Sequence, residues 1–506
     1  MTNLVLDGAR ETSPPNHSDR RPLLRVWAGV RSRWLLLAAV TAAALVGAGV
    51  AQGGIGPLAV ALLICGTAVA ICIGRLGAVG LGIWALVSGP ANPFLRYPLE
   101  HPYLTFDRVW LLGIGASLVL VSTQVKWSRT TRKLVIAMGV FCAVYGLLSL
   151  FSAAATDSIG PIEIWIDAIL LPSVLFVVTA LLVTTVEQVR RLAAAVVAGG
   201  VVISAIAIAE TLFGFELATR VGSIPRLDAT TGVIRVSGPY PAPEVLGLVL
   251  LICLAITLYW LQAKSRTWYL LGGAAAAVQL IAIGLTFFRA AWIGAILIVI
   301  AAFAIRPGRF GRLATAATVA SIALFVAFSF LSQVPVFASR VTSDVAVANV
   351  YARVAIDIQS LELFAQSPLT GIGADQYTAA ASGRLAPIWA GVTAVPEAHN
   401  SYLGLLAEQG LLGFIPFLAV TLLAIRAIRE VGRLGVVRDD ILMGACATGA
   451  GLAYLVMSLT LTMLPYGTSN AFLALLLGLV CGRLNARASE AVAEGLPLRG
   501  GGHHGA

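Results

Sequence analysis

The chain has 506 residues, of which 58% are hydrophobic and 11% charged, whereas about a quarter of the residues are charged in a soluble globular protein. This composition excludes an ordinary soluble domain and indicates an integral membrane protein. The formal net charge of +10 comes from residues scattered among short loops, so it does not indicate a nucleic-acid-binding surface.

Long apolar segments recur along the chain and predict the membrane-spanning helices. About 14 of them are long enough to cross the roughly 30 Å of hydrocarbon in a bilayer, so we expect an all-α polytopic bundle of about 12–14 transmembrane helices. The first follows a long polar tail without a small-residue cleavage site and is expected to be an uncleaved signal-anchor. The segments are 34–52, 55–73, 76–90, 108–123, 134–154, 163–184, 190–213, 244–262, 268–287, 290–306, 312–332, 406–425, 441–463 and 469–484.

Arginine and lysine residues concentrate in the tail and in alternate loops, and they predict the orientation. Cytoplasmic loops of membrane proteins carry an excess of these residues, so we expect both termini in the cytoplasm and residues 333–405 outside. The basic residues are Arg20, Arg21, Arg25, Arg31, Arg33, Lys126, Arg129, Arg132, Lys133, Arg190, Arg191, Lys264, Arg266, Arg306, Arg309, Arg312, Arg426, Arg429, Arg433 and Arg438.

The spans and loops divide the chain into five expected parts. These are a cytoplasmic basic tail (1–33), a transmembrane bundle with short loops (34–332), a large external loop (333–405), C-terminal transmembrane helices (406–484) and a disordered cytoplasmic tail (485–506). The six cysteines lie in or at the ends of spans, so no external disulfide framework is expected.

Arg289 lies in the stretch LTFFRAAWIG, between two apolar segments and on the side predicted to be external. A guanidinium group so close to hydrocarbon needs an anion, a carboxylate or water. The alternative is that the side chain extends to the lipid headgroups.

The large external loop contains a predicted amphipathic helix at Ser343–Gln366. Its apolar face carries Val347, Val350, Val354, Ile358 and Leu361. Arg353 and Asp357 are four residues apart on this helix, which favours either a solvated ion pair or a role in ligand binding.

His399 opens the stretch HNSYLGLLAEQGLLG at the external end of a predicted span. Asn400 and Ser401 suit the cap of the following helix, and Gly410 and Gly413 would let a neighbouring helix approach closely. A neutral imidazole here could accept a proton from an external hydroxyl. The alternative is a histidine held by structural hydrogen bonds.

Taken together, these motifs resemble the bacterial O-antigen ligase and O-antigen polymerase superfamily. The pair His399–Asn400 is followed by Gly410 and Gly413 at the family's spacing, and PLTGIGADQY (368–377) with the preceding Arg353 resembles its periplasmic loop. FFRAAWIG (287–294) resembles its arginine-containing helix junction. RVSGPYPAPEVLG (235–247) loosely resembles an earlier external loop, although it has Pro243–Glu244 in place of a more polar turn.

The resemblance implies a GT-C-like glycosyltransferase in the bacterial cytoplasmic membrane. Such an enzyme moves a glycan from a polyprenyl-pyrophosphate donor to the hydroxyl of a glycan or glycolipid acceptor, without a cofactor or metal. The resemblance implies His399 as the catalytic base, Arg289 and Arg353 as donor-pyrophosphate ligands and Arg235 as a further donor contact. We expect Asn400, Glu408, Gly410 and Gly413 to support the site. The predicted first external loop, around Gly53 and Gly54, lacks a carboxylate, which fits a metal-free site.

Several functions remain open from the sequence. A ligase and a repeat-unit polymerase share the donor chemistry and differ only in the acceptor. A polysaccharide or lipid transporter is disfavoured because the charges cluster in external loops and not at mid-membrane, where transporter sites lie. A purely structural envelope protein would give no reason to hold arginines and a histidine at one boundary.

Overall fold

The computed structural model describes residues 76–97, 104–120, 127–215, 217, 235–262, 266–304, 344–381, 397–433 and 438–493. The predicted spans at 34–52, 55–73 and 312–332 lie outside the described residues, as does the basic N-terminal tail. Each of the other predicted spans overlaps a helix. The fold is therefore that of an all-α polytopic membrane protein, as predicted.

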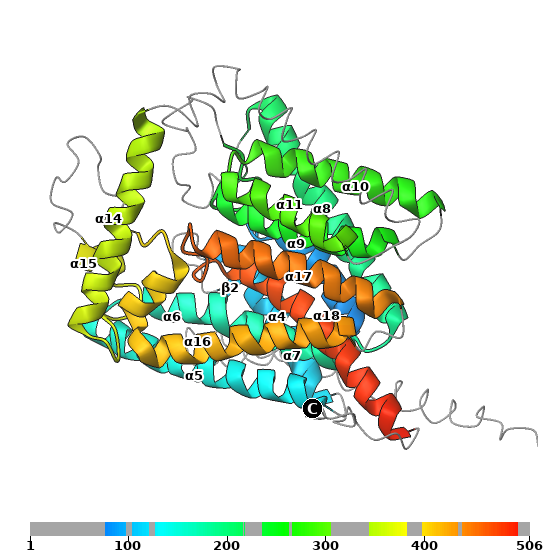
Figure 1. Cartoon of the computed structure of the whole chain (residues 1–506), viewed down its shortest axis with the longest axis horizontal. Helices are drawn as coiled ribbons and strands as arrows, with labels where there is room; N and C mark the ends of the chain where they lie inside the picture. Colours follow the sequence, from blue (N-terminus) through cyan, green and yellow to red (C-terminus); the bar gives the residue numbers. More distant parts are fainter. Residues whose placement is uncertain are drawn as a thin grey trace, which may run out of the picture. The chain divides into compact units, whose positions relative to one another are not determined.

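Helices make up nearly all of the described structure (Figure 1). They are α3 (Ala78–Ala91), α4 (Phe106–Leu120), α5 (Arg129–Thr156), α6 (Gly160–Ile164), the π-helix η2 (Trp165–Leu170), α7 (Leu171–Leu182), α8 (Val186–Phe213), α9 (Pro243–Gln262), α10 (Arg266–Leu285), α11 (Arg289–Ala304), α14 (Asp344–Gln366), α15 (Tyr377–Ala381), α16 (Ser401–Arg433), α17 (Arg438–Ser458) and α18 (Gly467–Ala493). Two short strands, β1 (Arg96–Tyr97) and β2 (Leu104–Thr105), pair antiparallel with Arg96 opposite Thr105. Within the described residues, seven helical stretches are long and apolar enough to span a membrane.

Helix α9 is the centre of the bundle. Every residue from 245 to 261 is buried, and the helix contacts α8, α10, α11, α17 and α18. A helix that is apolar on all sides needs partners on all sides, or lipid, to cover it. Here neighbouring helices cover it.

Short polar motifs begin and end the long helices. Ser128 caps α5 by accepting a hydrogen bond from the Thr131 N–H, and Thr185 forms a capping box with Gln188 at the start of α8. Each cap satisfies backbone groups that would otherwise lack partners near the membrane boundary.

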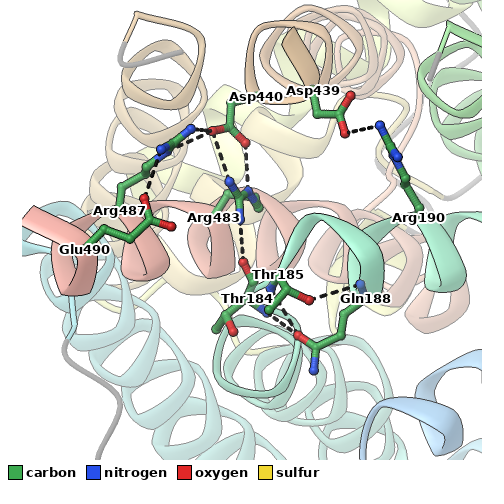
Figure 2. Close-up of polar contacts among 9 residues, drawn as sticks. All are labelled: Thr184, Thr185, Gln188, Arg190, Asp439, Asp440, Arg483, Arg487 and Glu490. Carbon is green, nitrogen blue, oxygen red and sulfur yellow. Dashed lines mark hydrogen bonds and ion pairs between the residues drawn. The ribbon is translucent and has the colours of Figure 1, made fainter. Parts of the chain in front are cut away.

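The helix ends containing residues 128–131, 184–190, 426–433, 438–440 and 483–490 meet at one end of the bundle, which we call the distal end. Figure 2 shows its buried ion pairs. Asp440 accepts hydrogen bonds from Arg483 Nε (2.7 Å) and Arg487 Nη2 (2.9 Å), and Arg190 pairs with Asp439 at 2.9 Å. Arg483 also donates to the Thr184 carbonyl at 2.6 Å. These contacts bring together helix ends that carry several of the basic residues used to predict orientation.

This distal network corrects one predicted boundary. We expected the last span to end at 484 and a disordered tail to begin at 485, but α18 continues to Ala493. The pairs of Arg483 and Arg487 with Asp440 stabilise the additional turns by joining them to α17. Residues 494–506 lie outside the described part of the chain.

The opposite ends of these helices form the site end. There Ser401 Oγ, at the start of α16, donates to the Leu461 carbonyl and accepts from the Met463 N–H, both at 2.7 Å. Figure 1 shows α14 lying across the bundle at this end, where it contacts α16.

Candidate functional site

The predicted site residues come from four separate parts of the chain that meet at the site end. Arg235 precedes α9, Arg289 is the first residue of α11, and Arg353 lies within α14. His399 and Asn400 directly precede α16. Alternation of the helices therefore places the starts of α9, α11 and α16 at the same end of the bundle.

Arg235 is joined to two elements of the site end. Its Nη2 pairs with Glu244 Oε1 at 2.5 Å, in the first turn of α9. Its Nε donates to the Thr286 carbonyl at 3.1 Å, in the turn between α10 and α11. Arg235 thus holds the loop before α9 against the turn that leads into Arg289.

That turn is tight and positions Arg289. Phe287 has a φ of 50°, a left-handed conformation that is uncommon for a bulky residue. Thr286 stabilises the turn because its hydroxyl donates to the Ile283 carbonyl at 2.7 Å and accepts from the Phe288 N–H at 3.2 Å. Arg289 follows directly, and its side chain is exposed at the positive end of the α11 dipole.

Arg353 is half-buried and lies within electrostatic range of the other two arginines. Burial lowers the pKa of its guanidinium group, and the charges of Arg289 and Arg235 lower it further. Glu244 and Asp357 act in the opposite direction. Three guanidinium groups and two carboxylates therefore share this region, and an anion bound among the arginines would relieve their mutual repulsion.

His399 lies in the same electrostatic environment and is half-buried. Burial lowers the pKa of its imidazole, and the charge of Arg353 lowers it further, while Glu244 opposes the shift. The imidazole is therefore neutral at neutral pH and has a nitrogen able to accept a proton.

Asn400 joins the start of α16 to α14. Its Oδ1 accepts the N–H groups of Tyr402 at 3.0 Å and Leu403 at 3.3 Å, so it is the cap of α16, as expected. Its side chain also hydrogen-bonds to the Asp357 carboxylate on α14. Asp357 thus stabilises the position of Arg353 and His399 relative to each other by linking their two elements.

The predicted packing role of Gly410 is wrong. Gly410 interrupts α16 with φ 58° and ψ −159°, and the atoms nearest to a Cβ there are backbone atoms of Leu369 and Gly371, which belong to a loop and not to a helix. A Cβ on Gly413 would meet Gln409 of its own helix at 2.6 Å. Gly410 allows α16 to break and residues 368–373 to insert.

The inserted loop satisfies the backbone groups that the break leaves open. We call residues 367–377 together with the kink at Gly410 the kink clamp. Its hydrogen bonds run from the N–H groups of Leu411, Leu412, Ile372 and Gly373 to the carbonyls of Pro368 (2.9 Å), Leu369 (3.0 Å), Ala407 (2.9 Å) and Glu408 (3.0 Å) respectively.

Glu408 completes the kink clamp. Its Oε1 accepts the Tyr377 N–H at 3.1 Å, and its carboxylate also bonds to the N–H groups of Asp375 and Gln376. Glu408 therefore caps α15 and holds the loop that resembles the family motif.

Sequence reasoning did not single out Glu244 or Tyr466 as site residues. Glu244 pairs with Arg235. Its charge opposes the lowering of the His399 pKa and adds to the rise that burial causes in the pKa of Tyr466. The sequence signal was the acidic residue in the turn Pro243–Glu244, beside an arginine-containing loop. Tyr466 had no signal, because its position depends on the loop between α17 and α18.

The fold and this site define a class: a polytopic membrane protein with a cationic, histidine-containing site at one end of its helices. Residues 274–418 match the family model described as O-antigen ligase. This match supports the O-antigen ligase and O-antigen polymerase superfamily, which the motifs predicted. The match includes Arg289, Arg353 and His399 but not Arg235. No curated protein matches the chain.

Proposed function

We propose that the protein transfers a glycan from a polyprenyl-pyrophosphate donor to an acceptor hydroxyl at the outer face of the cytoplasmic membrane. The match of residues 274–418 to the O-antigen ligase family supports glycosyl transfer of the ligase or polymerase type. The observation that carries the proposal is a half-buried histidine within electrostatic range of Arg353, which in turn lies within range of Arg289 and Arg235.

The proposed reaction assigns one role to each group. His399 accepts the proton of the acceptor hydroxyl as its oxygen attacks the anomeric carbon of the donor sugar. The bond from that carbon to the pyrophosphate oxygen breaks, and polyprenyl pyrophosphate leaves with the bonding electrons. Arg289 and Arg353 stabilise the charge on this leaving group through charge-assisted hydrogen bonds.

Arg235 has a more limited role in this proposal. Because it already pairs with Glu244 and bonds to Thr286, only part of its donor capacity is available to a ligand. It positions Arg289 and contributes positive charge near the pyrophosphate.

The direct test is transfer by the purified protein in lipid with a polyprenyl-pyrophosphate-linked glycan. His399→Ala and Arg289→Ala are each expected to lower kcat by about 10²–10³, the usual effect of losing a general base or an electrostatic donor. Glu187→Gln, on the exposed surface of α8, is the control and should have wild-type activity. Full activity in both site variants would refute the catalytic roles.

The same assay separates a ligase from a polymerase. A single product formed only on an added glycolipid acceptor would identify a ligase. A ladder of longer lipid-linked chains, formed without that acceptor, would identify a polymerase of the same superfamily.

Metal independence is part of the proposal, because the arginines would neutralise the pyrophosphate charge. Single-turnover transfer should persist in excess chelator. Loss of transfer that one divalent ion restores would overturn this point.

Helix α14 presents Val354, Ile358 and Leu361 outward, each about half exposed. An apolar stripe on a helix beside a membrane suits contact with lipid, and we include contact with the donor's polyprenyl chain in the proposal. Replacing the three residues by serine should weaken donor binding and leave kcat at saturating donor unchanged. Unchanged donor affinity would refute this contact.

A further inference from the structure

A cavity of about 200 Å³ opens at the site end, between α3, α4, η2, α9 and α18. Ligand pockets for drug-sized molecules measure about 300–1,000 Å³, so this cavity suits a single small ring. Its polar wall residues are Asn92, Thr105, Asp107, Asp167, Tyr240, Tyr466 and Thr468.

Two carboxylates give the cavity an acidic character. Asp167 forms a bidentate pair with Arg108, with distances of 2.6 and 2.7 Å. Asp107 accepts hydrogen bonds from Trp84 Nε1 at 2.9 Å and Ser88 Oγ at 2.8 Å. Both carboxylates are therefore held rigidly, and no arginine or lysine is among the described residues that line the cavity, so its wall offers no cation to a phosphate group.

The remaining polar wall groups are uncharged. The Asn92 amide already exchanges hydrogen bonds with Asp107. Thr105, Tyr466 and Thr468 supply hydroxyl groups, and the apolar residues Leu111, Leu171 and Val245 supply apolar contact surface. A small number of donors and acceptors on an apolar wall suits a ligand with several hydroxyl groups and apolar C–H faces.

The cavity is joined to the catalytic candidates on two sides. Tyr240 and Val245 belong to the segment that the Arg235–Glu244 pair anchors. Tyr466 belongs to the loop that bonds to Ser401, two residues after His399. Burial raises the pKa of Tyr466, and the charges of Glu397 and Glu244 raise it further. This cavity-lining tyrosine therefore lies within electrostatic range of Glu244, the partner of Arg235.

We infer that this cavity binds an uncharged sugar residue of the glycan substrates. The pyrophosphate then binds outside the cavity, among Arg235, Arg289 and Arg353. The inference rests on the proposed function. It adds a binding site for the sugar that takes part in the reaction. Either the first sugar of the donor or the sugar that carries the acceptor hydroxyl has the required chemistry.

The test removes two hydroxyl groups without changing shape, in the double variant Tyr466→Phe/Thr468→Val. Two probes are compared in nanodiscs, polyprenyl pyrophosphate alone and polyprenyl pyrophosphate that carries one N-acetylglucosamine. If the donor sugar occupies the cavity, the double variant should bind the glycosylated probe about tenfold more weakly and the bare lipid equally well. Arg353→Gln should weaken binding of both probes.

A second measurement covers the acceptor. If the acceptor sugar occupies the cavity, the double variant should bind both probes as the wild type does, while the KM for the acceptor rises about tenfold. Tyr259→Phe is the matched control because Tyr259 is a buried tyrosine on α9 that does not line the cavity. Tyr259→Phe should change neither the affinity for the probes nor the KM for the acceptor.

The outcomes separate this inference from the proposed function. Wild-type affinities and wild-type acceptor KM in the double variant, with transfer lost in His399→Ala, would overturn the sugar site and leave the transferase in place. Failure of the wild type to bind either lipid would overturn both.

Discussion

The groups around His399 suit it to the role of base that we propose. An ordinary histidine is partly protonated near neutral pH, but burial and the charge of Arg353 lower the pKa of this one. The residue that would bind the pyrophosphate therefore also keeps the base deprotonated. The influence of the Arg353 charge on the pKa of His399 can therefore be measured separately from donor binding.

The pH dependence of kcat/KM should report this coupling. A base acts only when deprotonated, so the rate should fall as the pH drops through the pKa of His399. Arg353→Gln removes a positive charge that lowers this pKa. The pKa should therefore rise, and the acidic limb of the profile should move to higher pH.

Arg353→Lys is the matched control for this prediction. It keeps the positive charge but loses the planar fork that binds phosphate oxygens. The rate should fall in both variants, by about 10²–10³ in Arg353→Gln. The acidic limb of the pH profile should stay near its wild-type position only in Arg353→Lys. An acidic limb that does not move in Arg353→Gln would show that His399 is not the titrating base.

Among the elements, α16 has two functions that its kink separates. The part before Gly410 is capped by Asn400 and bonds through the carboxylate of Glu408 to the loop that follows α14, and the part after it continues as an apolar helix. The kink clamp joins this helix to the loop that follows α14. The positions of Arg353 and His399 therefore both depend on one backbone break.

Gly410→Ala should destabilise the protein and lower its activity. The backbone has a positive φ at this position, which costs a residue with a side chain about 1–3 kcal/mol. A Cβ would also lie 2.4 Å from the Leu369 carbonyl oxygen, which is backbone that cannot move aside easily. Thermal unfolding in lipid, followed by tryptophan fluorescence, should show a lower Tm.

Gly432→Ala tests whether any glycine in α16 would behave in this way. The nearest atom to a Cβ there is 3.9 Å away, an ordinary contact. Alanine is about 1 kcal/mol better than glycine inside a helix, so this variant should be as stable as the wild type or more stable. Equal effects of the two substitutions would contradict the importance of the kink.

The kink also shows where sequence reasoning about elements reaches its limit. The motif spacing of His399, Gly410 and Gly413 was recognisable, and the cap at Asn400 could be predicted from local chemistry. Glycines three residues apart in an apolar segment favour helix packing. The positive φ of Gly410, however, results from insertion of residues 368–373, which are distant in sequence, so no local pattern could reveal it.

For the whole molecule, the alternation of helices accounts for most of what could be predicted. Span lengths and basic loops depend on the bilayer alone, which explains why each predicted span among the described residues overlaps a helix. The expected grouping of Arg289, Arg353 and His399 came from the family resemblance. The pairing of Arg235 with Glu244 and the position of Tyr466 depend on loop conformations that periodicity does not encode.

Orientation in the membrane decides whether the proposed site faces the lipid-linked glycan outside the cell. The basic residues of the distal end predict that this end is cytoplasmic. Thr370, in the kink clamp, and Glu187, at the start of α8, are exposed residues at opposite ends of the bundle. Cysteines placed there can be labelled from one side of the membrane.

We expect Thr370→Cys to react with an impermeant maleimide in intact bacterial cells, and Glu187→Cys to react only after permeabilisation. The parent protein should carry Cys65→Ser and Cys72→Ser, since Cys142, Cys253, Cys446 and Cys481 are buried and should give little background. The reverse pattern would place His399 in the cytoplasm, away from an exported glycan. Labelling of both in intact cells would contradict the alternation itself, because residues at opposite ends of a membrane-spanning bundle cannot face the same compartment.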